Sequence, residues 1–382
     1  MRMNSSFYMI LLWLFWSVTS LAQTVMVTVE NPVRTERKSE TISIPLEQIS
    51  SMLQVSDQAA LTVTEKGRTL LSQIVEGELL FQSDFGKRER KTFHIKQSDA
   101  VKETPQSLVD GRLVLPREDY AWENDRIAFR MYGPPLANDV NNGIDVWTKR
   151  VRHLIVQKWY KESEGAPPGK DTYHEDRGEG ADFFAVGRTL GGGSSGIWYS
   201  GKLYQPGVFT SQRTIANGPI RVVFELTYDG WDVDGRRFRE VKRISLDAGH
   251  NLNRIQVSLI GADPGDSLLV ASGVVKRANT TAAHDTKNSW LSLWGLTTKD
   301  SVNGYLGTGI VVPHSDFAGF VEDDNHYLAL GRMSGKGTFV YYSGAGWTRS
   351  GDFANEKAWK SYLHSFAQRI RAPLKVSVAL KK

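Results

Sequence analysis

Alternation of apolar and polar residues is the main pattern along this chain. It starts at residues 24–29 and returns at residues 40–45 and 92–95. Successive side chains of a strand face opposite sides, so this period of two predicts strands with one buried face. Residues 23–115 are therefore predicted to form a small N-terminal β domain.

The same pattern is more regular in the second half of the chain. Alternating runs lie at residues 219–228, 238–246, 253–259, 268–275 and 305–312. Glycine-punctuated strands at this spacing, with few helical windows between them, are typical of an all-β sandwich. A large β-sandwich domain is predicted over residues 116–382. No internal period indicates a propeller or a solenoid.

Two stretches have helical character instead. Residues 46–53 fit one short helical turn, and residues 355–371 are the best helix candidate because Trp359, Leu363 and Phe366 fall on one side. Residues 117–124 are interpreted as a linker between the two domains.

The first 22 residues are predicted to be a signal peptide and not part of the fold. Arg2 supplies the positive end, residues 7–16 the apolar segment, and residues 20–22 a small-residue cleavage site. The apolar run is short for a membrane span. Cleavage before Gln23 predicts a periplasmic or secreted protein without a membrane anchor. An uncleaved anchor is the alternative.

Composition narrows the chemistry. The 382 residues include no cysteine, so disulfides, thiolate catalysis and cysteine-bound zinc are excluded. The formal net charge of +5 is modest, and no lysine- or arginine-rich block is present, which argues against a nucleic-acid partner. The 11 tryptophans suit either a sugar-binding surface or a large β core.

Candidate chemistry is concentrated between residues 130 and 196. His174 follows Tyr173 in a loop rich in carboxylates, and a neutral imidazole can remove and return a proton near neutral pH. We therefore interpret His174 as an acid/base, Tyr173 as its partner and Lys149 as a cation that steadies a sugar carboxylate. A loop histidine bonded to the backbone is the plainer alternative.

The predicted substrate-binding residues come from the same segment and from two later loops. Arg130 would join Lys149 in clamping the carboxylate, since it lies near the end of an alternating run at residues 125–132. In a strand, Lys149 would face away from Arg150 and Arg152. The remaining candidates are Arg152, Asp176, Asp182, His314 and Trp347.

Other site types were weighed against this one. His174, Asp176 and Asp182 match no known metal spacing, so no metal site is predicted and cofactors are left open. The glycine run at residues 191–196 lacks the ending of a phosphate loop and is interpreted as a turn that allows close backbone approach. A serine hydrolase is not indicated. A pair of glycosidase carboxylates stays open, because their separation is spatial.

Several segments together resemble a known family. They read RMYGP at 130–134, GIDVWTKR at 143–150, YHED at 173–176, GAD at 180–182, NGPIR at 217–221 and LDAG at 246–249. With them the chain resembles a secreted bacterial family long labelled a domain of unknown function, found in polysaccharide-utilisation gene clusters. One branch is similar to an oligosaccharide dehydratase acting on ulvan. The resemblance implies a sandwich like that of galactose mutarotase.

The expected function follows from the resemblance and the candidate residues together. We expect an exported carbohydrate-active enzyme that eliminates water, or a glycosidic leaving group, from the non-reducing-end uronic acid of an acidic oligosaccharide such as ulvan. Trp347 would stack on the sugar ring, and Asp176 and Asp182 would orient the reacting groups. A glycoside hydrolase and a non-catalytic glycan-binding β-sandwich are the alternatives. The oligomeric state is left open.

Overall fold

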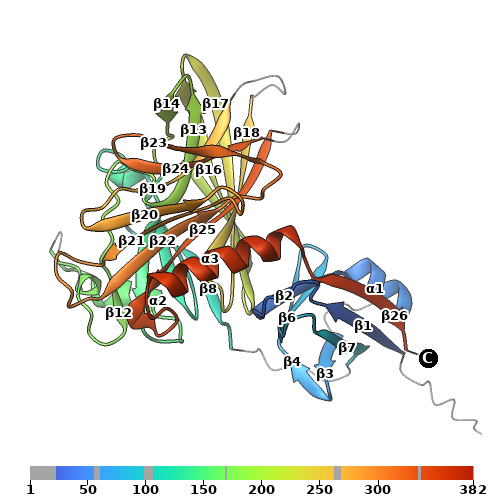
Figure 1. The fold of residues 1–382 in the computed structure, drawn as a ribbon. Helices are drawn as coiled ribbons and strands as arrows, with labels where there is room; N and C mark the ends of the chain where they lie inside the picture. Colours follow the sequence, from blue (N-terminus) through green and yellow to red (C-terminus); the bar gives the residue numbers. More distant parts are fainter. Residues whose placement is uncertain are drawn as a thin grey trace, which may run out of the picture.

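The computed structural model describes residues 23–55, 61–98, 106–167, 170–261, 268–333 and 337–381. The predicted signal peptide at residues 1–22 lies outside these ranges. Strands dominate the described residues, and the predicted all-β class is confirmed, with a small N-terminal β domain beside a large β-sandwich (Figure 1).

The N-terminal domain consists of two antiparallel sheets and one short helix. Its five-stranded sheet has the order β26 (Lys375–Leu380), β1 (Thr24–Glu30), β7 (Arg90–Gln97), β3 (Leu61–Glu65) and β4 (Arg68–Leu70). Its three-stranded sheet has the order β2 (Arg37–Pro45), β6 (Glu78–Phe85) and β5 (Ser72–Val75). Helix α1 (Leu46–Leu53) occupies the predicted helical turn. The alternating valines of β1 are fully buried between these elements.

The domain boundary differs from the one predicted at residue 115. The C-terminal strand β26 pairs with β1, so the last strand of the chain belongs to the N-terminal sheet. Strand β8 (Val109–Val114) pairs instead with β9 (Asp119–Asn124) in the main domain. The predicted linker at residues 117–124 is wrong for the same reason: β9 is a buried strand, and its backbone is hydrogen-bonded on both sides.

The main domain contains three antiparallel sheets. The eight-stranded sheet has the order β15 (Ser211–Asn217), β16 (Arg221–Val233), β17 (Arg236–Asp247), β18 (Leu252–Ile260), β25 (Thr338–Trp347), β22 (Tyr305–Val311), β21 (Trp290–Leu296) and β20 (Thr280–Asp285). One five-stranded sheet has the order β12 (Gly180–Asp182), β11 (Asp145–Lys149), β10 (Ile127–Met131), β9 and β8. The other has the order β14 (Lys202–Tyr204), β13 (Gly192–Tyr199), β19 (Leu269–Val275), β24 (His326–Arg332) and β23 (Phe317–Glu322).

A single large core joins these three sheets. Phe129 from one five-stranded sheet and Val270 from the other share it with Phe224 of the eight-stranded sheet. Both smaller sheets therefore pack on one face of the large sheet, which makes the domain a sandwich. Short helical elements complete it: α2 (Val156–Glu162) and the 3-10 turns η2 (Pro134–Leu136), η3 (Thr172–His174) and η4 (Thr348–Ser350).

The predicted C-terminal helix is present as α3 (Glu356–Arg371) and covers the other face of the large sheet (Figure 1). Trp359 and Leu363 are fully buried against the sheet. The packing is close, since a Cβ on Gly307 would lie 2.6 Å from the Trp359 ring. In the described part of the chain, none of the helices has the length and apolar composition needed to cross a bilayer.

The start of α3 gives a first testable prediction. The Asn355 side chain accepts a hydrogen bond from the Ala358 backbone N–H at 3.0 Å and so caps the helix. We expect Asn355→Ala to lower the free energy of unfolding by about 1 kcal/mol, measured by chemical denaturation. Asn355→Asp keeps the acceptor and should stay close to wild type. Equal losses in both variants would contradict a capping role.

The glycine run at residues 191–196 forms the start of β13 and not a turn. Its other predicted property, close backbone approach, is present. Gly191 has a φ of +61°, and a Cβ there would lie 2.3 Å from the Ile144 carbonyl oxygen. This contact joins β13 to the strand that carries Asp145, because Ile144 and Gly191 form a parallel bridge.

Candidate active site

The face of the β12–β11–β10–β9 sheet that points away from the main core carries a polar cluster. Alternation places Arg130 on this face, opposite Asp145 in the neighbouring strand, as the sequence predicted. Trp147 follows on the same face and lies opposite Asp182 of β12. Helix α2 and turn η3 cover this face with Trp159, Tyr160 and Tyr173. The layer of side chains between the sheet and these two helical elements is aromatic in its middle and charged at both ends.

Arg130 is the centre of the cluster. Its Nη2 lies 2.7 Å from Asp145 Oδ2 and 3.0 Å from Asp182 Oδ2, and its Nη1 lies 3.7 Å from Asp119 Oδ2. Its Nη1 also donates to the Tyr173 hydroxyl at 3.3 Å. The guanidinium is buried and surrounded by carboxylates. Arg130 is therefore in the predicted site, but it holds these acidic groups in place and cannot clamp a substrate carboxylate.

Burial and charge set the protonation of this cluster. Burial raises the pKa of Asp182 well above its usual range, the nearby Asp145 carboxylate raises it further, and Arg130 opposes the rise. The pKa of Asp119 is raised by burial too, again against the charge of Arg130. Burial raises the pKa of Tyr173 to about 12 despite two neighbouring arginines. The site thus favours the neutral forms of Asp119, Asp182 and Tyr173.

His174 lies at the open edge of this cluster. Its Nδ1 is 3.1 Å from the Asp182 carbonyl oxygen and 3.5 Å from Asp182 Oδ2. A carbonyl oxygen only accepts, so Nδ1 donates and the neutral ring keeps Nε2 free to take a proton. The side chain is 45% exposed, and Nε2 lies 4.0 Å from Asp171 Oδ2. The exposed ring of His174 can therefore contact a ligand, and its hydrogen bond to the Asp182 carbonyl oxygen fixes the tautomer.

Arg117 is the accessible cation of the site. It forms an ion pair with Asp171 and donates to the Tyr173 hydroxyl at 3.0 Å, and its side chain is 36% exposed. Burial would lower the pKa of Arg117, but the hydrogen bond to Asp171 leaves it raised. The sequence analysis missed this residue because residues 117–124 were interpreted as a linker. The open edge thus combines one guanidinium and one imidazole, and the buried Tyr173 hydroxyl accepts from the guanidinium.

The predicted role of Lys149 is corrected by the structure. Its Nζ is buried in an ion pair with Glu123 and donates to the Asn124 carbonyl oxygen at 2.7 Å. Glu123 also accepts the backbone N–H groups of Ile155 and Val156 at the start of α2. Lys149 therefore lies at the opposite end of the layer from Arg130 and joins α2 to the sheet. It does not meet His174.

Arg152 and Asp176 also form their ion pairs outside the cluster. Arg152 Nη1 lies 2.9 Å from Asp352 Oδ2, beside the η4 turn. Asp176 forms an ion pair with Arg150 at 3.1 Å, and its other oxygen accepts backbone N–H groups of Gly178 and Gly180. These contacts shape the loop after His174. Neither side chain points into the cluster, so their predicted substrate contacts are not supported.

His314 and Trp347 lie outside the cluster as well. The His314 Nδ1 is 2.8 Å from the Ser289 hydroxyl, at the Trp290 end of β21. Trp347 is buried in the core, where its Nε1 donates to the Asn303 carbonyl oxygen at 2.7 Å. A buried indole with its donor satisfied cannot stack on a sugar. The core alternative for Trp347 is correct.

The structure thus unites four of the predicted residues and separates five. Arg130, Tyr173, His174 and Asp182 meet, whereas the other five are distributed along loops and strand ends. In the described ranges, no group of three or more histidine, cysteine, aspartate or glutamate residues is placed to hold a metal ion. The groups that meet are suited to moving a proton beside a bound anion.

Comparison with known proteins identifies the family. The family model "Domain of unknown function (DUF4861)" matches residues 29–376. "Uncharacterized protein P7" from Formosa agariphila is 30% identical over 381 residues, covering 92% of this chain and 93% of that protein.

A solved structure, a protein in the glycosyl hydrolase family 38 from Enterococcus faecalis, has a TM-score of 0.49 and 9% identity to this chain. The match covers 94% of this chain and 47% of that one, so the chain spans about half the length of the hydrolase. With its family model matched over nearly all described residues, the chain belongs to the family "Domain of unknown function (DUF4861)".

Proposed function

We propose that this protein is an exported carbohydrate-active enzyme that eliminates water from the non-reducing-end uronic acid of an acidic oligosaccharide such as ulvan. The product is a 4,5-unsaturated uronate. The proposal combines the resemblance to the ulvan oligosaccharide dehydratase branch with the chemistry of the His174 cluster. Export is proposed from the signal-like residues 1–22.

The single observation that carries the proposal is the contact between Asp182 and the exposed His174. It fixes Nδ1 as the donor and leaves Nε2 of the 45% exposed side chain without a hydrogen as the proton acceptor. An acid/base group needs a defined tautomer and access to substrate, and this arrangement supplies both. The carboxylate of Asp171, whose Oδ2 lies 4.0 Å from Nε2, would stabilise the imidazolium once it has taken a proton.

The elimination requires two proton transfers, one from the substrate to His174 and one from His174 to the leaving group. His174 Nε2 takes the proton from C5, the electron pair of that C–H bond forms the C4=C5 double bond, and the C4–O bond breaks. The imidazolium returns the proton to the departing hydroxyl, which leaves as water. Arg117 would hold the sugar carboxylate, because a cation there makes the C5 proton more acidic.

Mass spectrometry after incubation with uronate oligosaccharides tests the proposal. Dehydration predicts a product lighter by one water, together with new ultraviolet absorption from the unsaturated uronate. A glycoside hydrolase would instead give fragments whose summed mass is greater by one water. A binding protein would leave every mass unchanged. Either of the last two results would contradict the proposed reaction.

A further inference from the structure

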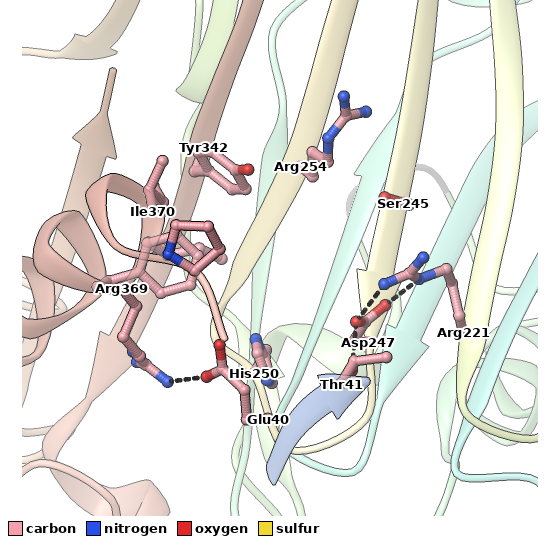
Figure 2. Close-up of a pocket in the computed structure, with 13 residues that line it drawn as sticks. Glu40, Thr41, Arg221, Ser245, Asp247, His250, Arg254, Tyr342, Arg369 and Ile370 are labelled. Carbon is pink, nitrogen blue, oxygen red and sulfur yellow. Dashed lines mark hydrogen bonds and ion pairs between the residues drawn. The ribbon is translucent and has the colours of Figure 1, made fainter. Parts of the chain in front are cut away.

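A second polar cavity lies far from His174 along the chain, where the two domains and α3 meet. Its volume is about 280 Å³, near the lower end for small-ligand sites. The N-terminal domain contributes Glu40 and Thr41 of β2, and α3 contributes Phe366 and Arg369. Strands β16, β17, β18 and β25 of the large sheet supply most of the remaining lining, together with His250 from the β17–β18 turn (Figure 2). Domain interfaces are preferred places for ligand sites.

Two of the three arginines in the cavity are paired. Arg221 binds Asp247 through two hydrogen bonds, and Asp247 also accepts from the Thr41 hydroxyl at 2.7 Å. Arg369 Nη1 lies 3.3 Å from Glu40 Oε2. In Figure 2 the Arg369–Glu40 pair lies at the lower left of the cavity and the Arg221–Asp247 pair at the lower right. The Arg369–Glu40 pair and the hydrogen bond from Thr41 to Asp247 join the N-terminal domain to the main domain, so these contacts are structural.

The third arginine, Arg254, has a different environment. Within the described residues it has no carboxylate partner; its Nη2 donates to the Gln256 amide oxygen at 3.5 Å, and its other polar neighbour is the Tyr342 hydroxyl. It projects from β18 directly opposite Tyr342 of β25, and Figure 2 shows the guanidinium standing apart from the Arg221–Asp247 pair. With three guanidinium groups and two carboxylates on its wall, the cavity has an excess of positive charge.

Apolar and aromatic groups lie beside this cation. Tyr342 and Phe366 pack edge to face with ring centroids 5.0 Å apart, and Leu252 lines the wall next to them. The cavity therefore offers a guanidinium that has no carboxylate partner in the described part of the chain, next to an apolar surface. A ligand with an anionic group on a compact ring would contact both, because guanidinium groups bind carboxylate and sulfate oxygens while ring faces pack on aromatic side chains.

We propose that this cavity is a second binding site, which takes a sugar unit carrying a carboxylate or a sulfate group and holds that group on Arg254. The anion part of the inference stands on the cavity alone, and the sugar part rests on the proposed function. Because its lining shares no residue with the His174 cluster, this site would hold another unit of an acidic glycan, or a second glycan, without taking part in the elimination.

Calorimetric titration with small probes tests the inference. The probes are D-glucuronate, N-acetyl-D-glucosamine 6-sulfate, sodium sulfate and neutral D-glucose. We expect one or both acidic sugars to bind wild type and glucose to bind at least tenfold more weakly. Arg254→Gln should weaken acidic-sugar binding by about tenfold or more, the usual effect of losing a charged hydrogen-bond donor. Titration with sodium sulfate shows whether the site binds an anion alone or requires the sugar as well.

The control variant is Arg213→Gln. Arg213 lies on β15 outside the cavity wall with a side chain that is 71% exposed, and its loss changes the net charge by the same amount. It should bind the probes as wild type does. Thermal unfolding of Arg254→Gln should match wild type, because Arg254 has no ion pair to lose among the described residues.

Several results would overturn the inference. They are no binding of any acidic probe to wild type, equal binding by wild type and Arg254→Gln, or loss of binding in Arg117→Gln but not in Arg254→Gln. The last result would show that the acidic probe binds at the His174 cluster and not in this cavity. These monosaccharide titrations involve no turnover. Arg254-dependent binding together with an absence of water loss would therefore refute the proposed function and leave this site standing.

Discussion

Replacing His174 with glutamine should lower kcat/KM for formation of the unsaturated uronate by about 10²- to 10⁴-fold, the range that a positioned general acid/base contributes. Glutamine keeps a polar side chain of similar reach and can still donate to the Asp182 carbonyl oxygen. It has no group that takes up a proton near neutral pH. The loss should therefore appear mainly in kcat, with KM little changed, because Arg117, and not His174, is the residue proposed to hold the sugar carboxylate.

His314→Gln is the matched control. His314 is also an exposed loop histidine, but it is hydrogen-bonded to Ser289 near the Trp290 end of β21. The loop after His174 is held near the opposite end, where Arg349 lies 3.6 Å from Asp176. His314→Gln should keep wild-type rates. Full activity in His174→Gln, or an equal loss in His314→Gln, would rule out the assigned acid/base.

The elements with a regular local pattern were predictable from the sequence. Helix α3 begins one residue from the predicted start because the cap, the apolar side and the length are all encoded within residues 355–371. The alternation at residues 125–132 placed Arg130 on the correct face for the same reason. Period and capping are local properties, so a single sequence reveals them.

The linker and the partners of charged side chains were not predictable in this way. Strand β9 is buried on both faces, so it lacks the alternation that marks a half-exposed strand. This error concealed Arg117 and Asp119. Lys149 and Arg130 both looked like free cations, although each finds its carboxylates on other strands. Which acid meets which base depends on strand register and chain crossings, and no local pattern encodes these.

Arg130→Met should destabilise the fold strongly, by about 3–5 kcal/mol in the free energy of unfolding at pH 7. Arg130 is buried and is the cation shared by Asp119, Asp145 and Asp182. Methionine fills part of the space but leaves these carboxyl groups without a counter-charge. Denaturant titration measures the loss. Arg213→Met, at an exposed ion pair, should change stability by less than about 1 kcal/mol.

The loss should grow as the pH rises through the pKa that Asp182 has in the folded wild-type protein. In wild type the pKa of Asp182 is already raised by burial and by Asp145, with Arg130 opposing the rise. Removing Arg130 raises it further, so the folded variant binds a proton that the unfolded chain releases above its own pKa of about 3.9. Stability falls with pH wherever the folded state binds more protons, by about 1.4 kcal/mol per pH unit for each extra proton.

A second substitution separates this cause from simple loss of packing. Asp182→Asn removes one carboxyl group that the Arg130→Met variant must keep protonated, at nearly the same volume. In the Asp182→Asn background, Arg130→Met should therefore cost less than it does in wild type, and its pH dependence should be shallower. A packing defect would instead give additive losses at every pH. Additivity would mean that Arg130 does not hold the acidic groups beneath His174, and the electrostatic account of the site would fall with it.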